Sequence, residues 1–230
     1  DLERDGGAVY VGGTGETNYI YNSTFNNNHA NTGNGGAVDW VAATGHILYS
    51  NFTDNYAQNG GALYLGGYAN STIVSHVVFD NNEAYHNGGA MESNATQVNL
   101  THTIFKNNKA DYGAALCREA GATGGFGYNN TFIANHARIG GAALAWMNVS
   151  NIKIDTYFFY NNSADVHGGA IYVLDESHNC KVYNSVFEGN FVLLGHGGAC
   201  DWVGKNGIIE NSTFYNNTAL GRFGSTSKGG

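Results

Sequence analysis

The sequence lacks proline and carries little charge. None of its 230 residues is proline, 12% are charged, and the net charge is −8 without any cluster of basic residues. Collagen is excluded, because it needs proline and a glycine at every third position. The missing basic patch argues against a nucleic acid as partner. No apolar run reaches the roughly 18 residues of a membrane span, so none is expected in this chain.

Cysteine is also scarce. Cys117, Cys180 and Cys200 are too few for a disulfide framework and lack the paired spacing of a zinc site. We expect three small buried side chains, with one bridged pair as the alternative. No residue spacing in the chain predicts a metal ion or a cofactor.

Glycine, asparagine and aromatic residues are abundant instead. The chain has 34 Gly, 32 Asn, 15 Tyr, 12 Phe and 3 Trp. Glycine and asparagine are poor helix formers, and disordered chains contain few aromatic residues. The composition therefore predicts many short strands joined by turns.

Two interleaved motifs repeat along the chain. In Phe-x-x-Asn, eight phenylalanines follow one another at steps of 26 to 28 residues: Phe25, Phe52, Phe79, Phe105, Phe132, Phe159, Phe187 and Phe214. Gly-Gly-Ala before an apolar residue starts at Gly6, Gly35, Gly60, Gly88, Gly140, Gly168 and Gly197, with a degenerate copy at Gly113. The segments between the motifs are β-rich and show no helical period. Each repeat therefore fits one coil of a parallel β-helix, whose strands pair with their counterparts one coil away.

The predicted fold is all-β: a right-handed parallel β-helix of about eight coils, with about 27 residues and two or three strands in each coil. Such a coil is too long for the left-handed hexapeptide type. We assign residues 1–230 to a single β-helix domain. Because no capping element is evident, we expect a segment or an open-ended unit of a longer array.

In this fold the repeated residues are scaffold. The phenylalanines would stack inside, and the asparagines three residues later would form a structural ladder of side-chain amides: Asn28, Asn55, Asn82, Asn108, Asn135, Asn162, Asn190 and Asn217. An apolar residue lies five positions before every phenylalanine of the repeat except Phe132, where Gly127 stands. The sequence Gly-Gly-Ala-Val-Asp-Trp-Val at 35–41 returns as Gly-Gly-Ala-Cys-Asp-Trp-Val at 197–203, six coils later, which indicates a duplication.

The alternation of Gly-Gly-Ala-(Ile/Val/Leu) with Phe-x-x-Asn, from Gly6 to Ala219, resembles the repeats of the chlamydial polymorphic outer-membrane proteins. It is also similar to the repeats of adhesin-like surface proteins of methanogenic archaea. The resemblance implies a right-handed β-helix exposed at a cell surface. It says less about function, because the β-helix fold serves adhesins, polysaccharide lyases and fibres alike.

Ten Asn-x-Ser/Thr sequons favour an extracellular or cell-surface location. Asn70, Asn94 and Asn148 lie in the variable half of the coil, so we expect them to be the most exposed. The candidate glycosylation sites are Asn22, Asn51, Asn70, Asn94, Asn99, Asn129, Asn148, Asn161, Asn211 and Asn216.

One repeat position carries acidic and aromatic residues, and we treat it as a candidate surface contact stripe: Tyr10, Asp39, Tyr64, Glu92, Tyr172 and Asp201. Asp39 and Glu92 would lie about 10 Å apart, slightly beyond the carboxylate separation of an inverting glycosidase, and no Lys or Arg is in register. Ordinary strand surface is the favoured interpretation, ahead of a sugar-stacking stripe and of a catalytic pair.

The histidines fit turns better than a metal site. His76 and His102 each lie three residues before a phenylalanine, so they should stack on adjacent coils, and no third ligand is in register. His86, His167 and His196 precede Gly-Gly turns and are interpreted as turn residues.

The sequence therefore favours a non-catalytic protein, either adhesin-like at a cell surface or a fibre-forming structural protein outside the cell. Its partners would be further copies of itself, stacked end to end, or a cell-surface glycan or protein. The alternative is a polysaccharide lyase or glycoside hydrolase of the β-helix type. That enzyme would need one groove with several converging charged groups.

Overall fold

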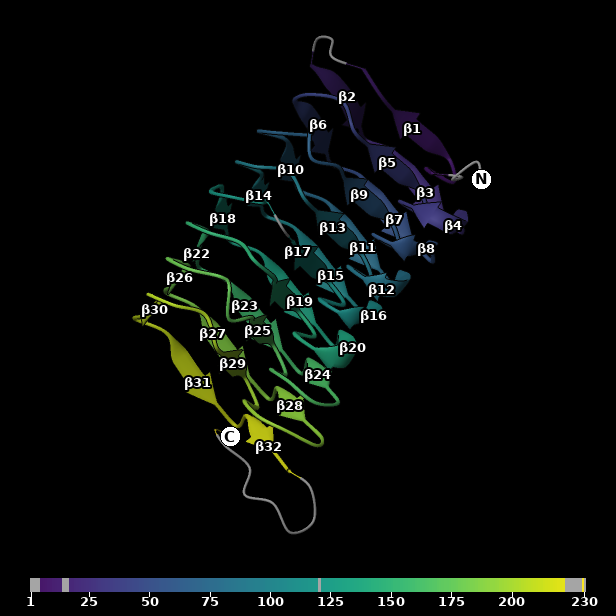
Figure 1. Ribbon diagram of the computed structural model, residues 1–230. Coiled ribbons are helices and arrows are strands. Elements are labelled where there is room, and N and C mark those ends of the chain that lie inside the picture. The colour runs from purple at the N-terminus through teal and green to yellow at the C-terminus, as the bar shows by residue number, and fades with distance from the viewer. Residues whose placement is uncertain (1–4, 14–16, 120, 222–228, 230) are drawn as a thin grey trace.

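The protein was analysed as a computed structural model, which describes residues 5–13, 17–119, 121–221 and 229. The described residues form 32 strands and no helix. These strands make four parallel sheets of eight strands each. The sheets run along one rod, with the first and last coils at opposite ends (Figure 1). The predicted parallel β-helix of about eight coils is confirmed. Each coil has four strands rather than two or three, because the short segment after the Phe-x-x-Asn motif also pairs with its neighbours.

The first sheet follows the Gly-Gly-Ala motif. A glycine with positive φ precedes each strand, and at Gly35 (φ 62°) an added Cβ would lie 2.1 Å from the Val38 carbonyl oxygen. In the sixth coil this position belongs to Gly141 rather than Gly140, so the motif there begins one residue later than the sequence indicated. The strands are β1 (Val9–Val11), β5 (Val38–Trp40), β9 (Leu63–Leu65), β13 (Met91–Ser93), β17 (Leu116–Arg118), β21 (Leu144–Trp146), β25 (Ile171–Val173) and β29 (Cys200–Trp202).

The second sheet turns one apolar residue per strand into the core. Gly127 takes this place in the fifth coil, where it pairs with Leu100 and Ile154. A Cβ on Gly127 would lie 1.9 Å from the hydroxyl of Tyr157, so this buried tyrosine from the next coil fills the space of the missing side chain. The strands are β2 (Asn18–Tyr21), β6 (Gly45–Leu48), β10 (Ile73–Ser75), β14 (Asn99–Thr101), β18 (Phe126–Tyr128), β22 (Lys153–Asp155), β26 (Lys181–Tyr183) and β30 (Ile208–Glu210).

The third sheet holds the phenylalanine stack. The eight rings are in register, with successive centroids 4.5 to 5.1 Å apart and ring planes within 18° of parallel. This confirms the predicted stack. The strands are β3 (Thr24–Asn26), β7 (Asn51–Thr53), β11 (Val78–Asp80), β15 (Ile104–Lys106), β19 (Thr131–Ile133), β23 (Phe158–Tyr160), β27 (Val186–Glu188) and β31 (Thr213–Tyr215).

The fourth sheet closes the coil with small side chains. Alanine points inward in every coil except the seventh, where Val192 does, and those from Ala84 onward belong to an apolar cluster of their own. The strands are β4 (His29–Asn34), β8 (Tyr56–Asn59), β12 (Glu83–Asn87), β16 (Lys109–Tyr112), β20 (His136–Gly140), β24 (Ser163–Ala164), β28 (Phe191–Val192) and β32 (Thr218–Ala219).

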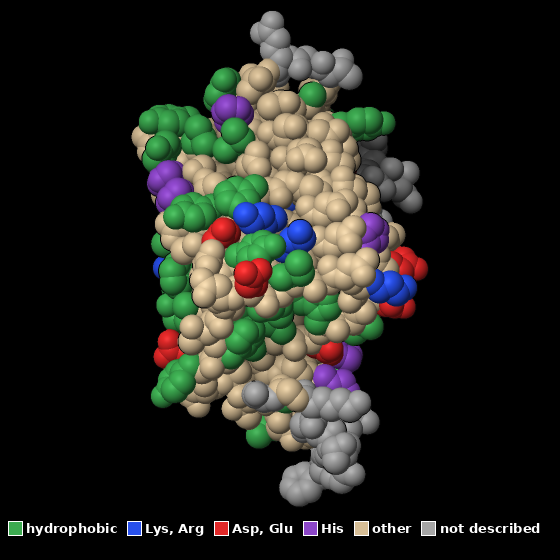
Figure 2. Space-filling model, turned by 90° about the vertical axis from the view of Figure 1, so that its left-hand side faces the viewer, with side chains coloured by type: hydrophobic (Ala, Val, Ile, Leu, Met, Phe, Trp, Pro, Cys, Tyr) green, Lys and Arg blue, Asp and Glu red, His purple; other side chains and the backbone are tan. Residues whose placement is uncertain are grey.

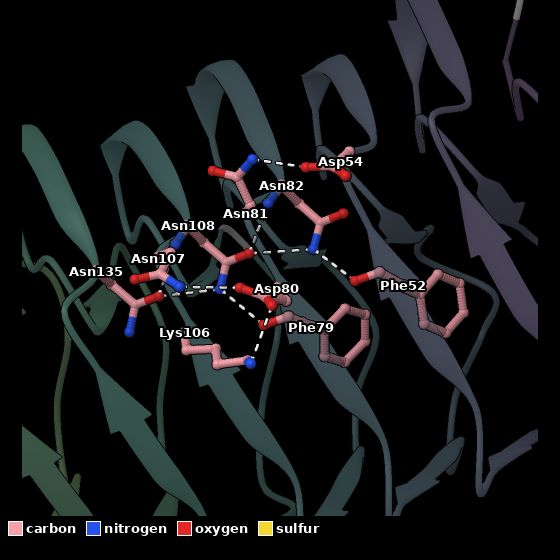
Figure 3. Close-up of polar contacts among 10 residues, drawn as sticks. All are labelled: Phe52, Asp54, Phe79, Asp80, Asn81, Asn82, Lys106, Asn107, Asn108 and Asn135. Carbon is pink, nitrogen blue, oxygen red and sulfur yellow. Dashed lines mark hydrogen bonds and ion pairs between the residues drawn. The ribbon is translucent and has the colours of Figure 1, made fainter.

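The asparagine ladder joins the third and fourth sheets (Figure 3). The Oδ1 atom of Asn82 accepts hydrogen bonds from the backbone N–H and the Nδ2 of Asn55, at 3.0 and 2.9 Å. Its own Nδ2 donates to Asn108 Oδ1 at 3.1 Å and to the Phe52 carbonyl at 3.0 Å. The same pattern runs from Asn28 to Asn217, which confirms the predicted ladder.

The duplicated tryptophan segment carries a packing partner. A Cβ on Gly45 would lie 2.4 Å from the ring of Trp40, and a Cβ on Gly207 would lie 2.4 Å from the ring of Trp202. Both tryptophans therefore need the same glycine five residues later, at the same separation of six coils. This adds a structural match to the predicted longer period.

Candidate functional site

The outward face of the first sheet contains the predicted contact stripe. The register confirms that Tyr10, Asp39, Tyr64, Glu92, Tyr172 and Asp201 share one row, with Cys117 and Ala145 between Glu92 and Tyr172. The row is not a continuous surface, however. Asp39 is 2% exposed and Glu92 is 3% exposed, whereas Tyr10 is 60% exposed. The interpretation of these two carboxylates as ordinary strand surface was wrong, because both side chains are buried.

Burial controls the charge of the row. Burial, as the larger cause, and the nearby charge of Asp5 together raise the pKa of Asp39 to about 7. Burial also raises the pKa of Glu92 well above its usual value, with the Glu119 carboxylate as the second cause. Asp39 Oδ1 and Glu92 Oε2 have no hydrogen-bond partner among the described residues. Both carboxyls therefore favour the neutral form.

This arrangement suits neither a glycosidase pair nor a thiol nucleophile. Tyr64 lies between the two carboxyls, and its hydroxyl accepts a hydrogen bond from Asn94 Nδ2 at 3.0 Å. A glycosidase needs two carboxyl groups that reach the same sugar bond from opposite sides. Burial raises the pKa of the Cys117 thiol, so the reactive thiolate is disfavoured there.

At its C-terminal end, the row meets His167, which the sequence analysis interpreted as a turn residue. The His167 ring stacks on Tyr172 with centroids 4.8 Å apart, and its Nδ1 lies 2.8 Å from Asp201 Oδ2. The backbone of His167 forms an isolated β-bridge with that of His196 in the next coil, so these two turns are adjacent. The sequence could have predicted this adjacency, because a histidine precedes Gly-Gly in both coils. The group is partly exposed and unites three neighbouring coils.

A second row of rings lies at the turn between the second and third sheets. We call Tyr21, Tyr49, His76, His102 and Tyr128 the corner row. Successive centroids are 5.6, 4.8, 4.8 and 5.9 Å apart, and the predicted stacking of His76 on His102 is confirmed, with an interplanar angle of 10°. All five side chains are exposed. In Figure 2, hydrophobic and histidine side chains gather along the left-hand edge of the face that is drawn.

The corner row depends on an unusual backbone. Tyr49, His76 and His102 have φ values of 51° to 55°, a left-handed conformation in which asparagine is favoured. Asparagine occupies this position in four other coils: Asn22, Asn129, Asn184 and Asn211. Tyr49, His76 and His102 therefore replace a residue that the turn prefers, which marks them as candidates for contact.

Metal and disulfide chemistry find little support in the described part of the chain. It contains no group of three or more His, Cys, Asp or Glu side chains arranged to hold a metal ion. All three cysteine thiols are free, two of them buried and Cys200 partly buried. Their burial agrees with the interpretation as small apolar side chains.

The sequons differ in exposure. Seven of the ten asparagines are exposed, whereas Asn94, Asn99 and Asn129 are partly buried. The expectation that Asn94 is among the most exposed was wrong. Its Nδ2, the atom that would carry a glycan, is bonded to Tyr64 instead. Asn70 and Asn148 are exposed, as expected.

Comparison with known proteins supports the resemblance noted in the sequence. Residues 156–174 match the Chlamydia polymorphic membrane protein repeat. This segment contains β23, β24 and β25, and so spans parts of three sheets. No curated protein and no solved structure matches the chain. Among the described residues, no helix is long and apolar enough to cross a membrane.

Proposed function

We propose that this chain is a non-catalytic, rod-shaped part of a cell-surface protein, and that its function is adhesive contact. The observation that carries the proposal is the uninterrupted stack of eight coils in which residues 156–174 match a repeat named for a membrane protein. A solenoid offers a long surface whose contacts repeat from coil to coil. The seven exposed sequons agree with a location outside the cytoplasm.

The corner row is the contact surface that the structure favours over the predicted stripe. Tyr49, His76 and His102 stack face to face, so they offer their edges to a partner, whereas Tyr21 and Tyr128 meet this stack edge-on. Tyrosine and histidine edges combine apolar carbon with hydrogen-bonding groups, which is typical of interfaces. A partner with repeating groups, such as a cell-surface glycan or protein, would bind through several weak contacts at once.

A panel assay separates contact from catalysis. The protein would be incubated with immobilised polysaccharides and with intact cells, and both retention and release of new sugar ends would be measured. We expect retention without cleavage. Release of new ends, with the rate lowered by Asp39→Asn or Glu92→Gln, would establish the lyase or hydrolase alternative and overturn the proposal.

The direction of the asparagine ladder favours a second candidate, end-to-end stacking of copies. Each ladder asparagine donates to Oδ1 of the next coil, so the last donor, Asn217, and the first acceptor, Asn28, are complementary. Phe214 is 47% exposed and would meet Phe25 of another copy in the same register. We expect filaments in electron micrographs that Asn217→Ala shortens. Monodisperse particles at high concentration would contradict this candidate.

A further inference from the structure

The inward face of the first sheet carries one charge where the other coils carry an apolar residue or, at Ser93, a serine. The third residue of each strand points into the core, and Arg118 occupies this position between Ser93 and Trp146. Arg118 is 6% exposed and Ser93 is fully buried. An unpaired charge in a protein core costs several kcal/mol, so such a guanidinium calls for a counter-charge.

The described residues do not supply that counter-charge. None of their ion pairs includes Arg118, and its one hydrogen bond runs from Nη2 to the Ala95 carbonyl at 3.4 Å. Its Nε–H is buried without a partner. Burial raises the pKa of its neighbours Tyr157 and Cys180, so both are neutral at pH 7. Burial lowers the pKa of Arg118 to about 10, which still leaves it cationic.

A cavity lies beside this guanidinium. Its volume is about 20 Å³, and its lining includes Arg118, Ser93, Tyr157 and Gly127. A space of this size holds one particle the size of a water molecule. The Ser93 hydroxyl is also buried without a partner. Two hydrogen-bond donors of the lining, Ser93 Oγ and Arg118 Nε, therefore have no acceptor among the described residues.

The cavity reaches the outward face of the second sheet. Phe126 and Lys153 also line it, and both are exposed on that face. At the outer end, the Lys153 ammonium lies 5.4 Å from the centre of the Phe126 ring and 3.8 Å from Asp155 Oδ2, its ion-pair partner. Gly127, which follows Phe126 and pairs with Ile154, also lines the cavity, beside the Tyr157 hydroxyl that fills the space of its missing side chain. An anion entering here would pass this ion pair and reach the unpaired guanidinium of Arg118.

We propose that this cavity binds one small monovalent anion of the halide class, held by Arg118 and Ser93. The anion neutralises the buried guanidinium and accepts the two unused donors. A water molecule would satisfy the donors but leave the charge uncompensated. Polyatomic organic anions are too large for a space of this volume.

Thermal unfolding in matched salts tests the proposal, with chloride as the probe. The wild-type protein would be unfolded in sodium gluconate and in sodium chloride at equal ionic strength. A ligand that binds only the folded state shifts the unfolding equilibrium constant in proportion to its excess over Kd. Chloride at 100 times its Kd therefore shifts this equilibrium about 100-fold toward the folded state. We expect a higher midpoint in chloride. Equal midpoints in both salts would overturn the proposal.

Two variants and one crystallographic measurement complete the test. Arg118→Met removes the charge and keeps the length, so the chloride effect should vanish. Lys109→Met removes one exposed cation as a matched control, and the chloride effect should remain. A chloride effect that persists in Arg118→Met would contradict the site. Crystals of the wild-type protein in sodium bromide should show an anomalous peak in the cavity, and its absence there would contradict the site even if the variant fails to fold.

Discussion

The two halves of each coil are built differently. In the third and fourth sheets nearly the same residue recurs in every coil, so each phenylalanine and each ladder asparagine contacts a copy of itself. In the first and second sheets the inward residues change from coil to coil, with Trp40, Arg118 and Gly127 among them. The uniform half fixes the register, because a shifted coil would break every rung at once. This leaves the variable half free to hold cavities, charges and surface rings.

Removing one rung of the uniform half should have the largest effect. Asn108 is fully buried and makes four ladder hydrogen bonds, so Asn108→Ala leaves several buried groups unpaired. Each such group costs about 1–3 kcal/mol, and we expect a loss of about 3–5 kcal/mol in the free energy of unfolding. Urea unfolding measures it.

The neighbouring Asn107 provides the matched control. It is exposed, and its side chain makes one hydrogen bond, to Asp80 at 2.9 Å (Figure 3). Alanine already occupies the equivalent turn at Ala134, with a similar positive φ. Asn107→Ala should therefore cost about 1 kcal/mol or less. Equal losses for the two variants would show that the ladder does not hold the register.

The next effect concerns the irregular pair in the variable half. Gly127→Val restores the repeat pattern but places Cβ on the Tyr157 hydroxyl, so we expect a loss of about 1–3 kcal/mol. Tyr157→Ser introduces the residue found at the equivalent position Ser185 and removes the clash. In a double-mutant cycle the pair should be less destabilised than the sum, by about 0.5–3 kcal/mol. Additive losses would refute the account of Gly127.

The pH dependence of stability should also be greater in the variable half. Asp39 has an ordinary pKa near 3.8 when unfolded and a pKa of about 7 when folded. Between these values the folded state binds a proton that the unfolded state has released, so stability falls as the pH rises from 4 to 7. Asp39→Asn should flatten this slope of the urea midpoint, and Asp175→Asn, on an exposed loop, should not. A wild-type midpoint that rises over this range would contradict the assignment.

The smallest effect should come from the corner row. His102→Asn introduces the residue that four other coils use at this left-handed turn. We expect the free energy of unfolding to change by less than about 0.5 kcal/mol, since the side chain is exposed. Calorimetry checks this. A large loss would mean that the rings stabilise the fold rather than offer a contact surface.

Periodicity explains which features the sequence could predict. The step between Phe79 and Phe105 sets the strand pairing, so the phenylalanine stack and the asparagine ladder followed from spacing alone. The burial of Asp39 and Glu92 did not follow, because the two-residue period of a strand shows which way a side chain points but not what covers it. The contact of Tyr157 with Gly127 joins two exceptions in adjacent coils, which no repeat reveals. Nor does the repeat reveal that the charge of Arg118 is unpaired.

The central claim is that the repeats hold the rod while surface exceptions make contact. Equilibrium binding to intact cells tests it most directly, with the wild type compared with a triple variant, Tyr21→Ser, Tyr49→Ser and Tyr128→Ser. Tyr85→Ser, which replaces an exposed tyrosine of the fourth sheet, is the control. We expect the triple variant to keep its unfolding midpoint and to bind at least about tenfold more weakly, because multivalent binding falls steeply as contacts are lost. Unchanged binding by the triple variant would contradict the claim.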